Sequence, residues 1–248
     1  MQRALSYSHQ HDDARAVRTL REHLSKHPDE LPPRRLLIRL LAASSDVPGA
    51  LREVDELARR VPRTDPSPEL ERGHVLELGH RFDEALDAYD HAALAAPADP
   101  RGPREGGLRS AHWGEAEDAS PRLEEAIRRG ARDADTWHAL GAVRAKLGDS
   151  AGAADAYRRV ELADPKRVDG RVGIATLALA QRDHAEALRQ YDELVKLRPR
   201  DSSFALARAY CLARLHRAAE ARSALRTAEE LGAAPAYVTK IQSLLRSP

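Results

Sequence analysis

The stretch DTWHALGAVRAKLGD at residues 135–149, followed by AGAADAYRRVELADP at 151–165, decides the fold of this chain. Apolar residues recur three and four positions apart in each half, which places them on one face of a helix. Gly148 and Asp149 separate the halves, and Pro165 ends the second half because proline cannot continue a helix. The stretch therefore predicts two helices joined by a tight turn.

The second half of this pattern returns along the chain with a period of about 34 residues, the length typical of a helix–turn–helix repeat. Residues 184–199 (HAEALRQYDELVKLRP) and 82–97 (FDEALDAYDHAALAAP) repeat its small residue, the aromatic residue four positions later and the final proline. The aromatic positions are Tyr89, Tyr157 and Tyr191. A fixed period of this length predicts a solenoid, because one helical hairpin cannot bury its apolar face alone and must stack on the next.

These residues resemble the tetratricopeptide repeat. Its Trp, Leu, Gly, Ala, aromatic and Pro positions hold Trp137, Leu140, Gly141, Ala153, Tyr157 and Pro165. The resemblance covers nearly the whole chain and implies an all-α fold, a right-handed superhelical solenoid of about seven hairpins. We expect one domain over 1–248, with units at about 1–30, 31–65, 66–99, 100–133, 134–167, 168–201 and 202–235 and a solvating cap helix at 236–246. We also expect Trp137 to be buried against the preceding unit.

The unit at 100–133 departs from the pattern. Its first helix carries Pro103, Gly106 and Gly107 where the motif has other residues, and two glycines inside a helix cost about 2 kcal/mol relative to alanine. Ser120 before Pro121 predicts the N-cap of its second helix. Two interpretations stay open: a soft joint at 101–117 between two halves of the solenoid, or a degenerate repeat that its neighbours hold straight.

The composition limits the function. The 248 residues carry a formal net charge of +1 and only 4% aromatic residues, so neither nucleic-acid binding nor attraction to a membrane surface is favoured. No apolar run approaches the roughly 18 residues of a membrane-spanning helix, and the N-terminus lacks the apolar core of a signal peptide. We expect a cytoplasmic protein. A periplasmic or outer-membrane-attached protein whose leader was removed is the alternative.

No catalytic, cofactor or metal motif stands out, so we expect a protein that is not an enzyme and needs no cofactor. Asp133 and Asp135 precede a predicted helix, where aspartate commonly caps the N-terminus. Two histidine pairs, His23 with His27 and His9 with His11, lack further ligands and are expected to lie on the surface. The single cysteine, Cys211, is expected to be a buried packing residue.

The resemblance implies that the first helix of each hairpin lines a groove. The N-terminal part of the predicted lining consists of Arg35, Arg39, His74, Glu77, Arg101, Arg104 and His112. The C-terminal part consists of His138, Ala142, Ala145, Val172, Thr176, Leu179, Leu206, Tyr210 and Ala213. The first part is mostly cationic and suits an acidic segment. The second is small and apolar, with Tyr210 as an anchor, and suits an amphipathic helix or an extended peptide.

The repeat pattern predicts a non-catalytic scaffold that binds a protein or peptide in this groove. Two alternatives stay open. The chain is either a self-assembling homo-oligomer that stacks through its terminal units, or a regulatory module of a larger enzyme or of a secretion or envelope complex. Some tetratricopeptide repeats hold the C-terminal carboxylate of a peptide with Lys and Asn. The corresponding positions here include His138, Ala142, Gly173, Ser203 and Ala207, so recognition of that kind is not expected.

Overall fold

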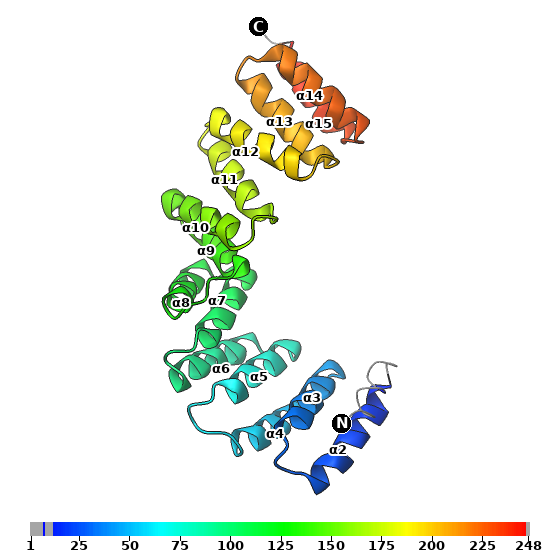
Figure 1. Ribbon diagram of the computed structural model, residues 1–248, viewed down its shortest axis with the longest axis vertical. Helices are drawn as coiled ribbons and strands as arrows, with labels where there is room; N and C mark the ends of the chain where they lie inside the picture. The colour runs from blue at the N-terminus through cyan, green and yellow to red at the C-terminus, as the bar shows by residue number, and fades with distance from the viewer. Residues whose placement is uncertain (1–6, 8–11, 247–248) are drawn as a thin grey trace. The chain divides into compact units, whose positions relative to one another are not determined.

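The computed structural model describes Tyr7 and residues 12–246, and every regular element in that part of the chain is an α-helix (Figure 1). The expected positions of His9 and His11 lie outside the described residues. The helices are α2 (Asp13–Lys26), α3 (Leu31–Ala43), α4 (Val47–Ala58), α5 (Ser67–Leu78), α6 (Phe82–Ala95), α7 (Arg101–Trp113), α8 (Ala116–Arg128), α9 (Ala134–Lys146), α10 (Ser150–Ala163), α11 (Asp169–Ala180), α12 (His184–Leu197), α13 (Ser202–Arg214), α14 (Ala218–Glu230) and α15 (Pro235–Leu244). The predicted all-α repeat solenoid is confirmed: from α3 to α14 the helices pack in consecutive hairpins, and α15 packs on α13 and α14.

The chain divides into two compact units, one up to Ala131 and one from Arg132. The first unit holds α2 to α8 and the second holds α9 to α15. The segment 101–117, for which the sequence left a joint or a degenerate repeat open, lies within the first unit, where α7 packs along α8. A soft joint at this segment stays a prediction.

Each hairpin turn contains one residue with a left-handed backbone. These residues are Ser45, His80, Gly114, Gly148, Arg182 and His216, with φ values between +56° and +91°. The last five are evenly spaced by one repeat length, so the period of the sequence is also a period of the backbone. Glycine adopts this conformation without a steric penalty, as predicted for the turn at Gly148.

Aspartate residues begin many of the helices. Asp46, Asp149 and Asp183 each accept a hydrogen bond from the backbone N–H three residues later, at the start of α4, α10 and α12. Asp133 does the same for α9, since its carboxylate accepts from Thr136 N at 3.1 Å. The predicted capping role of Asp133 is therefore confirmed, and it satisfies a helix N–H that otherwise has no partner.

The hairpins are held together by pairs of residues 16 positions apart, one on each helix. A Cβ atom added to Gly73 would lie 2.5 Å from the ring of Tyr89, and one added to Gly141 would lie 2.7 Å from the ring of Tyr157. At Gly107 the added atom would lie 2.8 Å from Leu123 Cγ. Large residues on the second helix thus need a very small residue on the first, because protein cores are close-packed.

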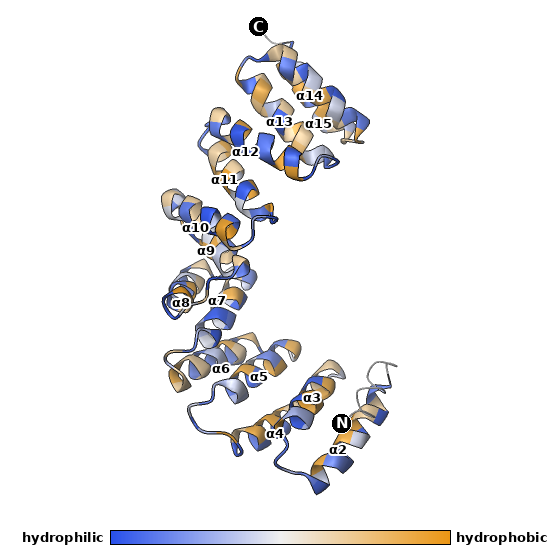
Figure 2. Ribbon diagram, viewed as in Figure 1, coloured by the Kyte–Doolittle hydropathy of each residue, from blue (hydrophilic) through white to orange (hydrophobic). Residues whose placement is uncertain are grey.

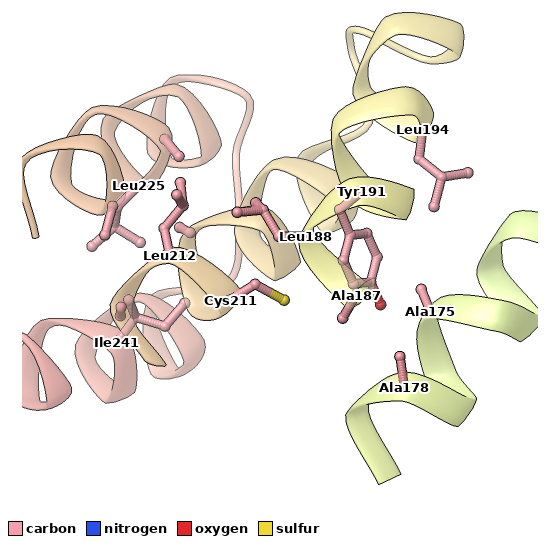
Figure 3. Close-up of a cluster of buried hydrophobic side chains, with 14 of the residues drawn as sticks. Ala175, Ala178, Ala187, Leu188, Tyr191, Leu194, Cys211, Leu212, Leu225 and Ile241 are labelled. Carbon is pink, nitrogen blue, oxygen red and sulfur yellow. The ribbon is translucent and has the colours of Figure 1, made fainter. Parts of the chain in front are cut away.

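The same slot in the second unit holds Tyr191, whose partner 16 positions earlier is Ala175. Figure 3 shows the Tyr191 ring reaching from α12 toward Ala175, beside the cluster that contains Cys211 and Leu212. The apolar stripes predicted from the sequence supply these buried positions, and Figure 2 shows apolar and polar residues mixed along the helices of both units.

The prediction for the start of α8 was wrong. Helix α8 begins at Ala116, so Ser120 is inside it and Pro121 is an internal proline. Packing against α7 explains the longer helix. The missing side chains of Gly102 and Gly107 let α7 approach its neighbours closely, and the buried face of α8 includes Leu123. Proline removes one helix hydrogen bond here, and tertiary contacts outweigh that local cost.

Trp137 is only half-buried, in contrast to the expectation of full burial. The guanidinium carbon of Arg159, on α10, lies 5.6 Å from the centre of its ring. A cation over an indole ring is a favourable contact, but it is weaker than complete burial. The cost of Trp137→Ala should therefore fall below the roughly 3–5 kcal/mol of a fully buried tryptophan.

Candidate binding surface on the first helices

Successive first helices leave three surface hollows at equivalent places in the repeat. One lies between α5 and α7 in the first unit, and the others lie between α9 and α11 and between α13 and α15 in the second unit. We call them the α5/α7, α9/α11 and α13/α15 hollows. Their volumes are about 290, 380 and 410 Å³. Hollows of this size accept side chains of a partner molecule.

The α5/α7 hollow is polar. It is lined by Arg35, Ser67, Leu70, Glu71, His74, Tyr89, Arg101 and Glu105. Three residues of the predicted lining, Arg35, His74 and Arg101, therefore come together at one place. Their surroundings are less cationic than the sequence suggested, because Glu71 and Glu105 line the same hollow.

Ion pairs within the first unit neutralise much of its predicted positive charge. Arg101 Nη2 lies 2.7 Å from Asp99 Oδ2, and Arg104 Nη1 lies 2.7 Å from Glu105 Oε1. The hydrogen bond from Arg101 lowers the pKa of Asp99, and this effect outweighs the opposite effect of partial burial. An acidic ligand at this hollow would compete with carboxylates that are already present.

The α9/α11 hollow is mostly apolar. It is lined by His138, Ala145, Tyr157, Asp169, Val172, Gly173, Thr176 and Leu177. Four of the predicted groove residues, His138, Ala145, Val172 and Thr176, thus share one site. The ring of Tyr157 lies 5.9 Å from that of His138, between the glycine-bearing faces of α9 and α11.

The slots of Tyr89 and Tyr157 differ in how the phenol oxygen is satisfied. In the first unit Tyr89 Oη donates to Glu77 Oε1 at 2.8 Å, and Arg109 Nε lies 2.6 Å from the same carboxylate oxygen. Burial and this hydrogen bond raise the pKa of Tyr89. Long polar side chains thus surround the hydroxyl of Tyr89.

In the second unit the residues two periods after Glu77 and Arg109 are Ala145 and Leu177. Both line the α9/α11 hollow, so apolar side chains take the place of the Glu–Arg pair. Tyr157 Oη has no hydrogen-bond partner among the described residues, and it is not one of the oxygen atoms sealed from solvent. Burial raises the pKa of Tyr157, so its hydroxyl is a neutral donor and acceptor on a residue that lines a mostly apolar hollow.

The α13/α15 hollow is also apolar. It is lined by Ser203, Leu206, Ala207, Tyr210, Tyr237, Lys240 and Ile241. Leu206 and Tyr210 were predicted, whereas the residues of α15 were missed because this helix was expected only to cover the end of the array. The period would have found them, since Tyr237 and Lys240 follow Ser203 and Leu206 by one repeat length.

The remaining predicted lining residues lie outside the three hollows. Arg39, His112 and Ala142 are exposed on α3, α7 and α9, and Arg104 is half-buried on α7. Leu179 is half-buried and packs against the main apolar cluster of the second unit, and Ala213 is buried in that cluster. Ala213 is therefore a packing residue, whereas the role predicted for Leu179 stays a prediction.

The histidine and cysteine residues considered for chemistry have structural surroundings. His23 Nε2 lies 2.8 Å from Glu30 Oε2, and within Tyr7 and residues 12–246 no group of three His, Cys, Asp or Glu side chains is placed to hold a metal ion. Cys211 is buried, as expected, and burial with the Asp192 carboxylate nearby raises the pKa of its thiol to about 12. Among the helices between Asp13 and Leu244, none combines the length and the apolar character that a membrane span requires.

Comparison with known proteins agrees with the repeat. A family model described as "Tetratricopeptide repeat" matches residues 114–167 and 172–237. The C-terminal part of a TPR repeat-containing protein from Cytophaga hutchinsonii is similar in structure, with a TM-score of 0.78 and 14% identity over 99% of each chain. YrrB, a TPR protein with an unusual peptide-binding site, has a TM-score of 0.67 and 17% identity over 77% of this chain and 97% of its own.

MamA, a third similar structure, has a TM-score of 0.63 and 17% identity over 67% of this chain and 91% of its own. No curated protein matches the chain in sequence. At such low identities the structural similarities establish the fold, while the chemistry of the surface must be argued from the residues of this chain.

Proposed function

Since the chain belongs to the tetratricopeptide repeat family, we propose that it is a non-catalytic adaptor that binds a peptide segment of a partner protein across α9 and α11. Proteins of this fold generally serve as interaction scaffolds, and the peptide-binding site of YrrB is a precedent within the same fold. The α9/α11 hollow would hold the segment. The alternatives of a homo-oligomer and of a regulatory module in a larger complex stay predictions, and so does the cytoplasmic location.

One observation carries this proposal: Tyr157 Oη lies without a partner in a hollow with apolar walls. Hydrogen bonding to a peptide N–H or C=O would satisfy it, while Val172 and Leu177 would contact an apolar side chain. In the first unit the corresponding oxygen is already bonded to Glu77, so the same ligand would gain nothing there. The difference between the units favours the second as the binding site.

Self-assembly through the C-terminal end receives less support. Thr239, Lys240 and Ser243 are exposed on α15, so part of the surface that this helix presents to solvent is polar. Stacking of a second copy on α15 would bury these groups at a cost.

The proposal is tested by selecting peptides from a random display library with the purified full chain and measuring their affinity by fluorescence anisotropy. Thr176→Glu places a carboxylate at the rim of the α9/α11 hollow on an exposed helix position, and we expect it to weaken a selected peptide about tenfold or more. Leu162→Glu is the matched control, because Leu162 is 76% exposed on α10 and outside the hollow.

Both variants should retain the circular dichroism spectrum of the parent chain. Unchanged affinity of the selected peptides for the Thr176→Glu chain, or an equal loss in the Leu162→Glu chain, would contradict binding across α9 and α11.

A further inference from the structure

The C-terminal helix α15 has the register of a further first helix. Its Tyr237, Lys240 and Ile241 stand one repeat length after Ser203, Leu206 and Ala207 of α13, and all six residues line the α13/α15 hollow. Tyr237 is 62% exposed, an unusual degree for an aromatic ring beside a hollow. Helix α15 therefore forms one side of a hollow, as the first helices of the hairpins do.

Lys240 is the one charged residue among those that line this hollow, and the nearby carboxylate of Asp201, at the N-terminus of α13, accepts hydrogen bonds from Ser203. Helices α13 and α15 carry Arg208, Arg214 and Lys240 and no acidic residue. Arg208 Nε is bonded to Asp192 Oδ1 at 2.6 Å, and Arg214 Nε lies 3.3 Å from His184 Nε2. Lys240 Nζ, in contrast, has no carboxylate within 4 Å among the described residues, although it belongs to the lining. Among the lining residues, Lys240 thus offers a cation without a carboxylate partner at the edge of an apolar site.

We propose that the α13/α15 hollow binds an acidic segment of a partner protein. An apolar side chain of the segment enters between Tyr210 and Tyr237, and an adjacent Asp or Glu side chain pairs with Lys240. This inference deepens the proposed adaptor function and rests on it, but it concerns a different pair of helices and a different chemistry.

The size and charge of the site select this partner. A volume of about 410 Å³ accommodates one large apolar side chain with part of the peptide backbone. Tyr210 and Tyr237 offer broad contact area at little entropic cost, as aromatic residues do at interfaces. One lysine complements one carboxylate, whereas a nucleic acid or an anionic membrane requires a cluster of cations. A basic segment would be repelled by Lys240.

The test uses the full chain and three fluorescent peptides, each acetylated and amidated, with one Phe in a Gly-Ser background. The Phe is flanked by Glu in the first peptide, by Gln in the second and by Lys in the third. We expect the Glu peptide to bind most tightly, with an affinity several-fold above the Gln peptide at low salt. Lys240→Glu should weaken the Glu peptide about tenfold and leave the Gln peptide within twofold.

Lys166→Glu is the matched control, because Lys166 is exposed and outside the hollow but changes the net charge equally. Tyr237→Ala removes an exposed ring and should weaken the Glu and Gln peptides alike, at least fivefold. Lys240 and Tyr237 are both exposed, so these variants should fold, as circular dichroism would show.

The proposal is overturned if the Lys240→Glu and Lys166→Glu chains bind the Glu peptide equally, or if the parent chain binds the Gln or Lys peptide as tightly as the Glu peptide. A library-selected peptide that responds to Thr176→Glu but not to Lys240→Glu would overturn the acidic site while leaving the adaptor function standing. If the parent chain binds none of the designed or library-selected peptides, both the acidic site and the adaptor function are overturned.

Discussion

Replacing Gly141 by alanine tests the rule that pairs residues 16 positions apart across a hairpin. An added Cβ at Gly141 would lie 2.7 Å from Cδ1 and Cε1 of Tyr157, and one at Gly173 would lie 2.6 Å from Cε2 of the same ring. The ring therefore has little room to move away from a methyl group on α9. The substitution should destabilise the second unit even though alanine is the better helix former.

The expected magnitude follows from two opposing terms. Overpacking a well-filled core by one methyl group costs about 1–3 kcal/mol, and exchanging glycine for alanine inside a helix returns about 1 kcal/mol. In a Tyr157→Val background the clash is absent, so Gly141→Ala should instead stabilise by about 1 kcal/mol. The chain contains a natural version of this combination, since Val54 and Ile38 occupy the same two positions and are both buried.

The assay is urea denaturation of the four chains of this double-mutant cycle, followed by tryptophan fluorescence. The chain has two tryptophans, and a Trp113→Phe background leaves Trp137 in α9 as the reporter of the second unit. We expect a coupling free energy of about 1–3 kcal/mol between positions 141 and 157. Gly106→Ala is a control followed by circular dichroism, because its closest contact, at 3.2 Å, is the flexible Arg122 side chain.

Additive effects would refute the reasoning. If Gly141→Ala changes the free energy of unfolding by the same amount in the Tyr157 and Val backgrounds, within about 0.5 kcal/mol, the ring does not require the glycine. Gly106→Ala should cost less than Gly141→Ala. If both cost the same, α7 and α9 tolerate no side chain at these positions whatever their neighbours, and the Tyr157 ring is not the cause.

Two further predictions concern buried polar groups. Tyr89→Phe should cost about 1–2 kcal/mol in urea denaturation because it removes the hydrogen bond to Glu77, whereas Tyr157→Phe should cost less than about 0.5 kcal/mol; equal costs would contradict the difference between the slots. Cys211, with its pKa raised to about 12, should be roughly 10⁻⁴ thiolate at pH 8 and react with a thiol reagent only after denaturation, so rapid labelling of the folded chain would contradict its burial.

The sequence predicts the helices and their partners well because both follow from local chemistry and from the period. Hairpin turns, aspartate caps and the tyrosine slots recur at fixed spacing, and each is set by residues close in sequence. The sequence predicts helix boundaries and burial less well where packing against a neighbouring helix determines them. Pro121 is expected to start a helix by its own propensity, yet α8, packed against α7, already begins at Ala116. Trp137 is covered by Arg159 and is not part of a buried core.

The chemistry of the surface was predictable only in part, because it depends on which side chains pair with each other. Arg101 and Arg104 were correctly placed on a first helix, but the carboxylates that neutralise them became evident only from distances. The residues of α15 were missed for a different reason. A helix expected to end the array was not aligned with the first helices, although Tyr237 and Lys240 obey the same period.

Comparison of one unit with another offers a way to find such sites from sequence. The core slot keeps its tyrosine at 89 and 157, while the positions above it change from Glu77 and Arg109 to Ala145 and Leu177. The core and the surface can vary separately because the slot faces the neighbouring helix and the other positions face solvent. A repeat that retains its packing residues but loses the polar partner of its tyrosine leaves that hydroxyl able to bond a ligand at the surface. In this chain that change coincides with the α9/α11 hollow, which is why a binding site is expected there and not at Tyr89.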